Sequence, residues 1–168
     1  HEGVRWHDGE PVTAEDVAFT FRRAKDPEVG SPAQPYFSAW DSVEVVDRHT
    51  LRFHVRPAAG LFFGWTLVPV APEHLLGDVP PAELATHEFG SAGPVGSGPF
   101  RFVRRRAGDR WVLEANRDHP EALGGRPYLD RLVFRVIPDE TTLLAELRSG
   151  EVDFYHRVAP SQAEAVRS

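Results

Sequence analysis

Residues 90–100, GSAGPVGSGPF, constrain the fold more than any other stretch, because they hold four glycines and two prolines. A glycine-rich loop that binds phosphate passes directly into a helix, whose first N–H groups hold the anion. This run continues instead into residues 99–103, PFRFV, an alternation typical of a strand, and no Lys-Ser or Lys-Thr pair follows the last glycine. The stretch therefore predicts a loop that leads into a strand, and it argues against a nucleotide site.

The rest of the sequence alternates between helical and strand periodicity. Thr13 and Asp16 form a capping-box pattern ahead of a helix that Asp26-Pro27 ends. Further helices are expected from Pro72 to near Gly77 and over 139–148, where Gly150 ends the second of them. Alternating apolar residues predict hairpins over 43–55 and 100–116, and strands over 4–6, 131–137 and 152–158. The pattern predicts a mixed α/β chain without internal repeats.

Composition excludes several classes of protein. The 168 residues include no cysteine, which removes disulfides, thiol nucleophiles and cysteine-bound metals. No run of eighteen apolar residues and no leader pattern is present, so we expect neither a membrane span nor a signal peptide within the sequence. The net charge is −6, and the basic run 104–106 is followed at once by Ala-Gly-Asp, which favours a solvated hairpin end over contact with nucleic acid. Because the chain begins at His1 and lacks methionine, we expect it to be a piece of a longer protein.

No catalytic or metal-binding pattern stands out. The sequence lacks a Gly-x-Ser-x-Gly elbow, a His-Glu-x-x-His pair and the acid spacing of a calcium loop. His7 and Asp8 are adjacent, but neighbouring residues of a strand point to opposite faces, so a polar pair in a turn is the favoured interpretation. Asp153 and His156 would need further metal ligands that the sequence does not offer. We therefore expect no catalytic residue, no metal and no cofactor.

Aromatic residues occur in two segments where they need a reason. Tyr36, Phe37 and Trp40 follow a stretch rich in Pro, Gly and Ser, and Phe63 and Trp65 belong to the apolar block 61–67. The first segment is either a loop anchored to the core by its own aromatic residues, which is the favoured interpretation, or part of the lining of a cleft. The apolar block is expected to be mostly core.

Four motifs stand in one order along nearly the whole chain. They are GVRWHDGEPVTAEDVAFTFRRAKDP, VEVVDRHTLRFHV, PVGSGPFRFV and GGRPYLDRLVFRVIPDETTLLAELRSGEVDF. This order resembles the large extracellular solute-binding proteins of bacterial ABC importers, which capture di- and oligopeptides, nickel complexes and some oligosaccharides. The chain departs from that pattern after LEAN, where it has Arg117-Asp118-His119-Pro120 instead of Pro-Asp-Tyr-Trp.

The resemblance implies a fragment of the first lobe of a periplasmic-binding-protein-like fold of type II. Residues 1–92 would form its smaller, β-rich subdomain, and residues 93–168 would form part of its larger sheet. Gly96-Ser97-Gly98-Pro99-Phe100 would correspond to the family's Gly-Thr-Gly-Pro-Tyr motif. The glycines would then allow a tight crossing between the two subdomains.

The resemblance also implies solute capture without catalysis. Tyr36, Phe37 and Trp40, with Phe63 and Trp65 behind them, become the candidates for lining the cleft. The implied partners are a peptide or another small solute and the permease subunits of the importer, with no nucleic acid, and the implied state is a monomer outside the cytoplasmic membrane, anchored as a lipoprotein. The alternative is the ligand-sensing part of a bacterial transcription regulator, and a hydrolase is a more distant one.

Overall fold

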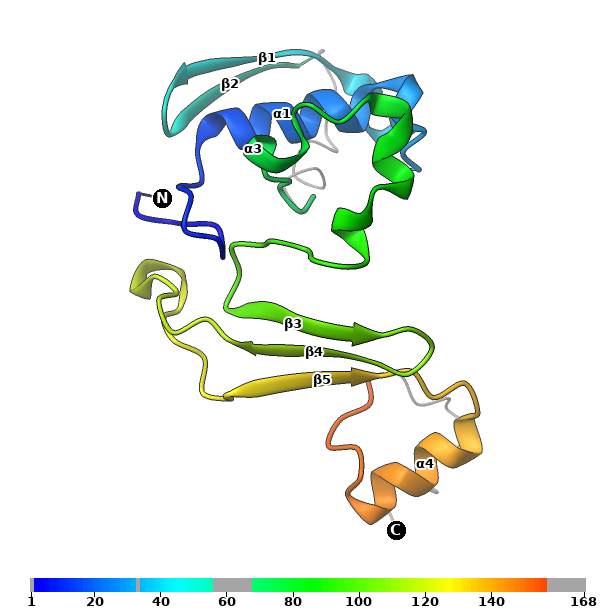
Figure 1. Cartoon of the computed structure of the whole chain (residues 1–168). Helices are drawn as coiled ribbons and strands as arrows, with labels where there is room; N and C mark the ends of the chain where they lie inside the picture. Colours follow the sequence, from blue (N-terminus) through cyan, green and yellow to red (C-terminus); the bar gives the residue numbers. More distant parts are fainter. Residues whose placement is uncertain (1, 33, 56–67, 157–168) are drawn as a thin grey trace.

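The computed structural model describes residues 2–32, 34–55 and 68–156, whose elements form two parts that lie one above the other (Figure 1). The first part contains α1 (Ala14–Lys25), α3 (Glu73–Leu76), β1 (Trp40–Asp47) and β2 (Thr50–Val55). The second part contains β3 (Phe100–Arg106), β4 (Arg110–Ala115), β5 (Arg131–Arg135) and α4 (Glu140–Ser149). Short 3-10 helices occur in the connections along the chain, at Pro27–Val29, Gln34–Ala39, Pro81–Thr86, Glu88–Gly90 and Glu121–Leu123. The described chain is mixed α/β, as the sequence predicts.

The core of the first part lies between α1 and the antiparallel β1–β2 hairpin. Phe21 on α1 is buried, and the centre of its ring lies 4.8 Å from that of Phe53 on β2 and 5.4 Å from that of Phe37. Trp40 at the start of β1 completes this cluster, with its ring centre 6.1 Å from that of Phe53. Aromatic rings at these spacings add to the free energy gained from burial alone.

The second part is a three-stranded antiparallel sheet in the order β3-β4-β5. The central strand β4 is the best buried, because Val112 on one face and Ala115 on the other are 5% and 8% exposed. α4 starts where the Asp139 carboxyl accepts hydrogen bonds from the backbone N–H and the hydroxyl of Thr142, both at 2.7 Å. An ion pair between Arg135 of β5 and Glu146 of α4, at 2.5 Å, fixes the helix to the sheet.

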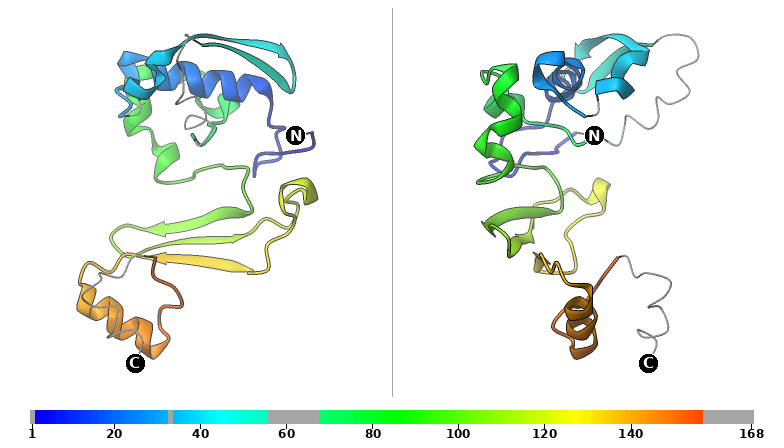
Figure 2. Two further views of the ribbon diagram at one scale, coloured as in Figure 1. Left: turned by 180° about the vertical axis from the view of Figure 1, so that it is seen from behind. Right: turned by 90° about the vertical axis from the view of Figure 1, so that its right-hand side faces the viewer.

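The two parts are joined by the stretch 91–99, which contains no helix or strand. Figure 2 shows the parts as separate layers in both views, with this stretch crossing between them. A glycine- and proline-rich segment suits such a crossing, since it supports neither a helix nor a sheet interior.

Several predicted elements are confirmed and two are wrong. Both hairpins form, and α1 and α4 begin and end within one residue of the expected limits. The expected strand over 4–6 is reduced to a single bridge between Arg5 and Pro11, and residues 152–156 form no strand. A strand requires a neighbour for its N–H and C=O groups, and among the described residues neither segment has an extended one. The segment 34–39, expected to be irregular, forms a 3-10 helix.

Candidate functional site

Two of the aromatic residues that we expected near a cleft, Phe37 and Trp40, lie in the core. Phe37 and Trp40 are 1% and 2% exposed and pack with Phe21, so they offer almost no surface to a solute. This burial favours the alternative in which the loop is anchored by its own aromatic residues. Tyr36 belongs to the 3-10 helix at 34–39. Phe63 and Trp65 lie outside the described residues, and contact of any of the five with a solute stays a prediction.

Lys25 fixes the end of the aromatic segment to the end of α1. Its ammonium group lies 4.5 Å from the centre of the Trp40 ring and donates a hydrogen bond of 2.8 Å to the Trp40 carbonyl oxygen. A cation over an indole face is attracted by the negative charge density of the ring. The side chain also lies at the C-terminal end of the helix dipole, where a positive charge is favourable.

The carboxyl group of Asp16 joins three segments at the start of α1. It is buried, and its Oδ2 accepts hydrogen bonds from the Thr13 backbone N–H at 2.8 Å and from Trp6 Nε1 at 3.3 Å. Its Oδ1 accepts a hydrogen bond of 2.9 Å from the Glu73 backbone N–H at the start of α3. The capping-box pattern predicts the bond to Thr13. The other two bonds join segments that are distant in sequence, and periodicity carries no signal for them.

Asp8 and His74 form a second link between the N-terminal segment and α3. His74 Nε2 lies 2.8 Å from Asp8 Oδ2. Partial burial pushes the pKa of the Asp8 carboxyl upward, but the hydrogen bonds from His74 and from the Glu10 backbone, with the charge of His74, outweigh burial and lower this pKa below its ordinary 3.8. The carboxyl therefore stabilises the fold in its ionised form.

His7 connects the N-terminal segment to the glycine-rich stretch. Its Nε2 lies 2.9 Å from the carbonyl oxygen of Gly98, its Nδ1 accepts a hydrogen bond of 3.3 Å from the Gly96 N–H, and its own backbone N–H donates to the Gly96 carbonyl at 2.8 Å. One ring nitrogen must donate and the other accept, so these contacts fit the neutral ring with its proton on Nε2. His7 thus forms specific contacts with the chain just before it enters β3.

Asn116 holds the other side of the same stretch. Its side-chain amide donates a hydrogen bond of 3.2 Å to the Gly98 carbonyl oxygen, and its backbone N–H donates one of 2.8 Å to the Pro99 carbonyl. The Gly98 oxygen therefore contacts His7 from the first part and Asn116 from the second. We call His7, Gly96, Gly98 and Asn116 the junction. His7, Gly96 and Gly98 lie in the sequence motifs and Asn116 is the last residue of LEAN, but nothing in their spacing predicts this contact.

The junction also shows what its glycines do. A Cβ atom added at Gly96 would lie 3.3 Å from Cε1 of His7, whereas at Gly98 it would meet no atom within 4 Å. Neither residue has the left-handed backbone that favours glycine. The tight crossing that we expected from the glycines therefore has a specific cause at Gly96, which is the close approach of the His7 ring.

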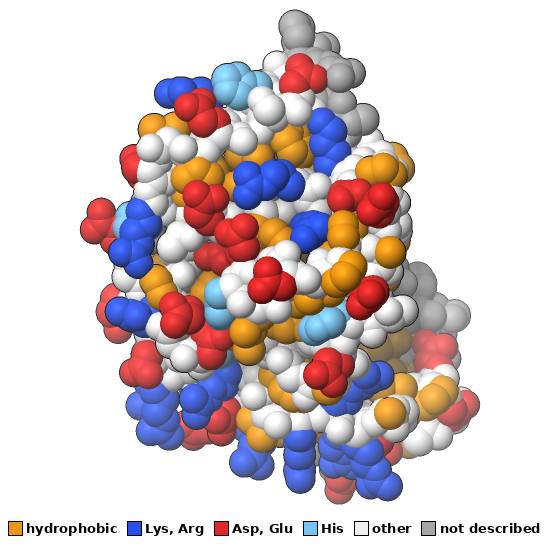
Figure 3. Space-filling model, turned by 45° about the horizontal axis from the view of Figure 1, so that its top comes forward, with side chains coloured by type: hydrophobic (Ala, Val, Ile, Leu, Met, Phe, Trp, Pro, Cys, Tyr) orange, Lys and Arg blue, Asp and Glu red, His pale blue; other side chains and the backbone are white. Residues whose placement is uncertain are grey.

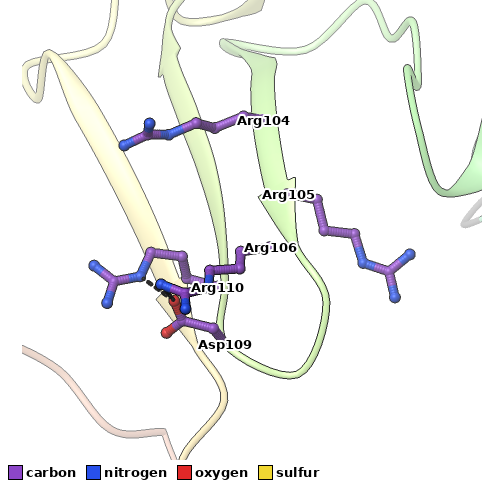
Figure 4. A pocket seen from close by; sticks show the side chains of 5 residues that line it. All are labelled: Arg104, Arg105, Arg106, Asp109 and Arg110. Carbon is purple, nitrogen blue, oxygen red and sulfur yellow. Dashed lines mark hydrogen bonds and ion pairs between the residues drawn. The ribbon is translucent and has the colours of Figure 1, made fainter.

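A shallow depression of about 280 Å³ lies at the turn between β3 and β4. Arg104, Arg105, Arg106, Asp109 and Arg110 line it, and Figure 4 shows Arg106 and Arg110 turned toward Asp109 while Arg105 points away. The distances to the Asp109 carboxyl are 3.6 Å from Arg106 and 3.0 Å from Arg110. The hydrogen bond from Arg110 and the surrounding guanidinium charges lower the pKa of Asp109, against the opposing effect of desolvation. The predicted solvated hairpin end is thus strongly basic.

The described residues bring together no group of three or more His, Asp, Glu or Cys side chains able to hold a metal ion. Among the helices at 14–25, 73–76 and 140–149, none has the length and apolar character needed to cross a bilayer.

In the face drawn in Figure 3, acidic side chains are scattered over the upper half and Lys and Arg side chains gather along the lower margin.

Comparison with known proteins gives one consistent result. The model of the family described as "Bacterial extracellular solute-binding proteins, family 5 Middle" matches residues 1–168. The oligopeptide-binding protein AppA of Bacillus subtilis is 36% identical over 157 residues, which are 92% of this chain and 28% of that relative. The structure of B. subtilis AppA in complex with a nonapeptide matches 98% of this chain and 32% of its own, with 34% identity and a TM-score of 0.89.

A nickel-binding relative has the same fold. The structure of NikZ from Campylobacter jejuni in complex with Ni(L-His) matches 90% of this chain and 29% of its own, with 27% identity and a TM-score of 0.78. The chain therefore spans about 30% of the length of the proteins to which it is similar.

Proposed function

This chain belongs to the bacterial extracellular solute-binding proteins of family 5, and we propose that it forms part of one lobe of a two-lobed protein that captures peptides or similar small solutes for an ABC importer. The observation that carries this proposal is the match of 98% of the chain, at a TM-score of 0.89, to a protein whose structure contains a bound nonapeptide. The match to a protein that holds Ni(L-His) supports a broader range of solutes.

The division of the chain supports the same proposal. We infer a smaller subdomain over residues 1–92 and part of a larger one over residues 93–168, with the junction at their border. His7 and Asn116 hold the Gly98 carbonyl oxygen from the two sides, at 2.9 and 3.2 Å. Groups held in this way keep one subdomain in place against the other, and a rigid lobe is what a closing cleft requires.

If the chain is part of one lobe, only the complete protein with both lobes should bind a solute tightly. A cleft binds tightly when it encloses most of the ligand surface, and one wall leaves much of that surface in water. Tyr36, Phe37, Trp40, Phe63 and Trp65 remain our candidates from this wall. Because Phe37 and Trp40 are 1% and 2% exposed, their contribution would be to support the wall from behind.

Location and partners follow from the same premise. We expect the full-length protein to be outside the cytoplasmic membrane, held there by a lipid anchor, to act as a monomer and to deliver its solute to the permease subunits without catalysis. The alternative, a sensor domain of a transcription regulator, has no support among the relatives described above, since AppA is a binding protein by name and the NikZ structure contains Ni(L-His).

The test is to identify the solute directly. The full-length protein containing this chain is purified from its host, unfolded, and the released small molecules are identified by mass spectrometry. Each is then returned to the refolded protein and measured by calorimetry beside unrelated peptides, oligosaccharides and nickel complexes. A peptide or similar solute that binds at one site supports the proposal, and conversion of a bound molecule to a product contradicts it.

A further inference from the structure

The most unusual feature outside the junction is the face of the three-stranded sheet that carries arginine. β4 places Arg110, Val112 and Glu114 on one face by the alternation of a strand. Their antiparallel partners share that face, and the resulting set contains six arginines: Arg101, Arg104 and Arg106 on β3, Arg110 on β4, and Arg131 and Arg135 on β5. We call this set the arginine face. Figure 4 shows Arg104 and Arg110 extending to the same side of the sheet, opposite to Arg105.

The positive charge of the arginine face is only half compensated. Three carboxylates pair with it: Glu114 with Arg101 at 2.6 Å, Asp109 with Arg106 and Arg110, and Glu146 with Arg135. Six guanidinium groups against three carboxylates leave an excess of three positive charges on this face. In the parts of the chain that the structure describes, Arg104 and Arg131 have no carboxylate within ion-pair distance.

The arrangement opposes the stability of the sheet. Arg106, Arg110 and Arg135 lie directly opposite one another in a single row across the three strands. Like charges at such positions repel each other, and among the described residues only two carboxylates, Asp109 and Glu146, offset the three positive charges of this row. The side chain of Arg106 is 81% exposed, so burial against the core does not account for it. The exposed guanidinium groups are therefore accessible to an external anion.

The chain as a whole is acidic, which narrows the choice of partner. With a net charge of −6, the chain is repelled by an anionic surface unless one face is oriented toward it. A single phosphate ion in water gains little from exposed arginines, whereas a bilayer of anionic lipids presents many phosphates in a plane and adds roughly 1 kcal/mol, or a factor of about five, per basic residue. The exposed Val133, 46% exposed between these arginines, suits the headgroup region of a membrane.

We propose that the arginine face binds the phosphate groups of an anionic membrane surface. Three uncompensated charges give an expected preference of about a hundredfold for anionic over neutral vesicles. This contact does not involve a solute, and it orients the chain with β3, β4 and β5 toward the bilayer. It goes beyond the proposed function, because solute capture requires no contact of the lobe with lipid.

The experiment is flotation of the 168-residue chain with vesicles of phosphatidylcholine alone and of equal parts phosphatidylcholine and phosphatidylglycerol. The test variant is Arg104→Gln with Arg106→Gln. The matched control is Arg52→Gln with Arg117→Gln, which changes the net charge equally at exposed arginines off this face. Melting curves of both variants confirm that they fold like the original chain.

We expect binding to the anionic vesicles that falls as salt is raised, a loss of roughly 30-fold in the test variant, and a change below about twofold in the control. Equal losses in the two variants, or equal binding to both kinds of vesicle, would overturn the proposal. So would competition by free phosphate beyond that of chloride at the same ionic strength, or tighter binding to double-stranded DNA than to vesicles. None of these outcomes bears on solute capture, so the two proposals fail separately.

Discussion

Substitution of Asp16 by alanine tests how the N-terminal segment, α1 and α3 are held together. The carboxyl accepts four hydrogen bonds, from two backbone N–H donors at 2.8 and 2.9 Å, from Trp6 Nε1 at 3.3 Å and from the Thr13 hydroxyl at 3.4 Å, and the residue is 4% exposed. Alanine leaves all four donors without this acceptor. The ring of Trp6, which is 3% exposed, has little access to replacement water.

The magnitude follows from these contacts. A hydrogen bond to a charged group contributes about 1.5–3 kcal/mol, and a buried donor left unsatisfied costs about 1–3 kcal/mol. We take the lower values for the two short bonds and about 1 kcal/mol for the bond from Trp6, and we add nothing for the 3.4 Å contact with the Thr13 hydroxyl. On this basis we expect Asp16→Ala to lower the free energy of unfolding by about 4 kcal/mol. Denaturation by urea, followed by circular dichroism, measures this change.

The neighbouring residue provides the control. Glu15 is more than half exposed, and its carboxyl lies 3.8 Å from Arg22, a surface ion pair that contributes little. Glu15→Ala should therefore change the free energy of unfolding by less than about 0.5 kcal/mol. If Asp16→Ala costs no more than Glu15→Ala, the assignment of Asp16 as the link between these segments is wrong.

Three further changes test other contacts. Thr13→Ala should lower the free energy of unfolding by about 1 kcal/mol, because Thr13 is the N-cap of α1, and an unchanged melting temperature would contradict this. Gly96→Ala should destabilise the chain, because the new Cβ meets the His7 ring at 3.3 Å. Gly98→Ala should be neutral or stabilise the chain by up to about 1 kcal/mol. If thermal melts give the reverse order of stability, the close approach of the His7 ring to Gly96 is refuted. Because the pKa of the Asp8 carboxyl is lowered, the carboxyl stabilises the fold at pH values above its ordinary pKa of 3.8 and loses this effect as the pH falls through the lowered pKa. The difference in melting temperature between the original chain and Asp8→Asn should therefore shrink in acid. A difference that stays constant with pH would contradict the pair with His74.

Local signals in the sequence predict most of the elements correctly. The cap at Thr13, the stop at Asp26-Pro27 and the turn at Gly108-Asp109 act over a few residues, so a reading of neighbours finds them. Two predicted strands do not form, the one over 4–6 and, as far as residue 156, the one over 152–158, and they show the limit of this approach. Alternation predicts that a segment suits a strand, but whether a second strand lies beside it depends on the tertiary fold.

The contacts between distant segments are the part that the sequence does not predict. His7 and Gly96 are 89 positions apart. The sequence marks Gly96 only as a glycine, and Gly98 is a glycine too, so the sequence does not show which of the two meets the His7 ring. For the segment with Phe37 and Trp40, the sequence favours a loop anchored by its own aromatic residues, because such residues stabilise a loop by packing onto the core. Both side chains are buried, in agreement with this interpretation. Assignment of the family came from four motifs in order, and no single contact supplied it.

The central claim is that this chain is one wall of a solute cleft, and a thermal-shift screen of the chain beside the full-length protein tests it most directly. Peptides, oligosaccharides and nickel complexes are offered to both at equal concentrations. The account predicts that a solute present at a hundredfold excess over its dissociation constant stabilises the full-length protein by roughly 2.7 kcal/mol and leaves the melting temperature of the 168-residue chain unchanged. Equal stabilisation of both by the same solute would contradict the account.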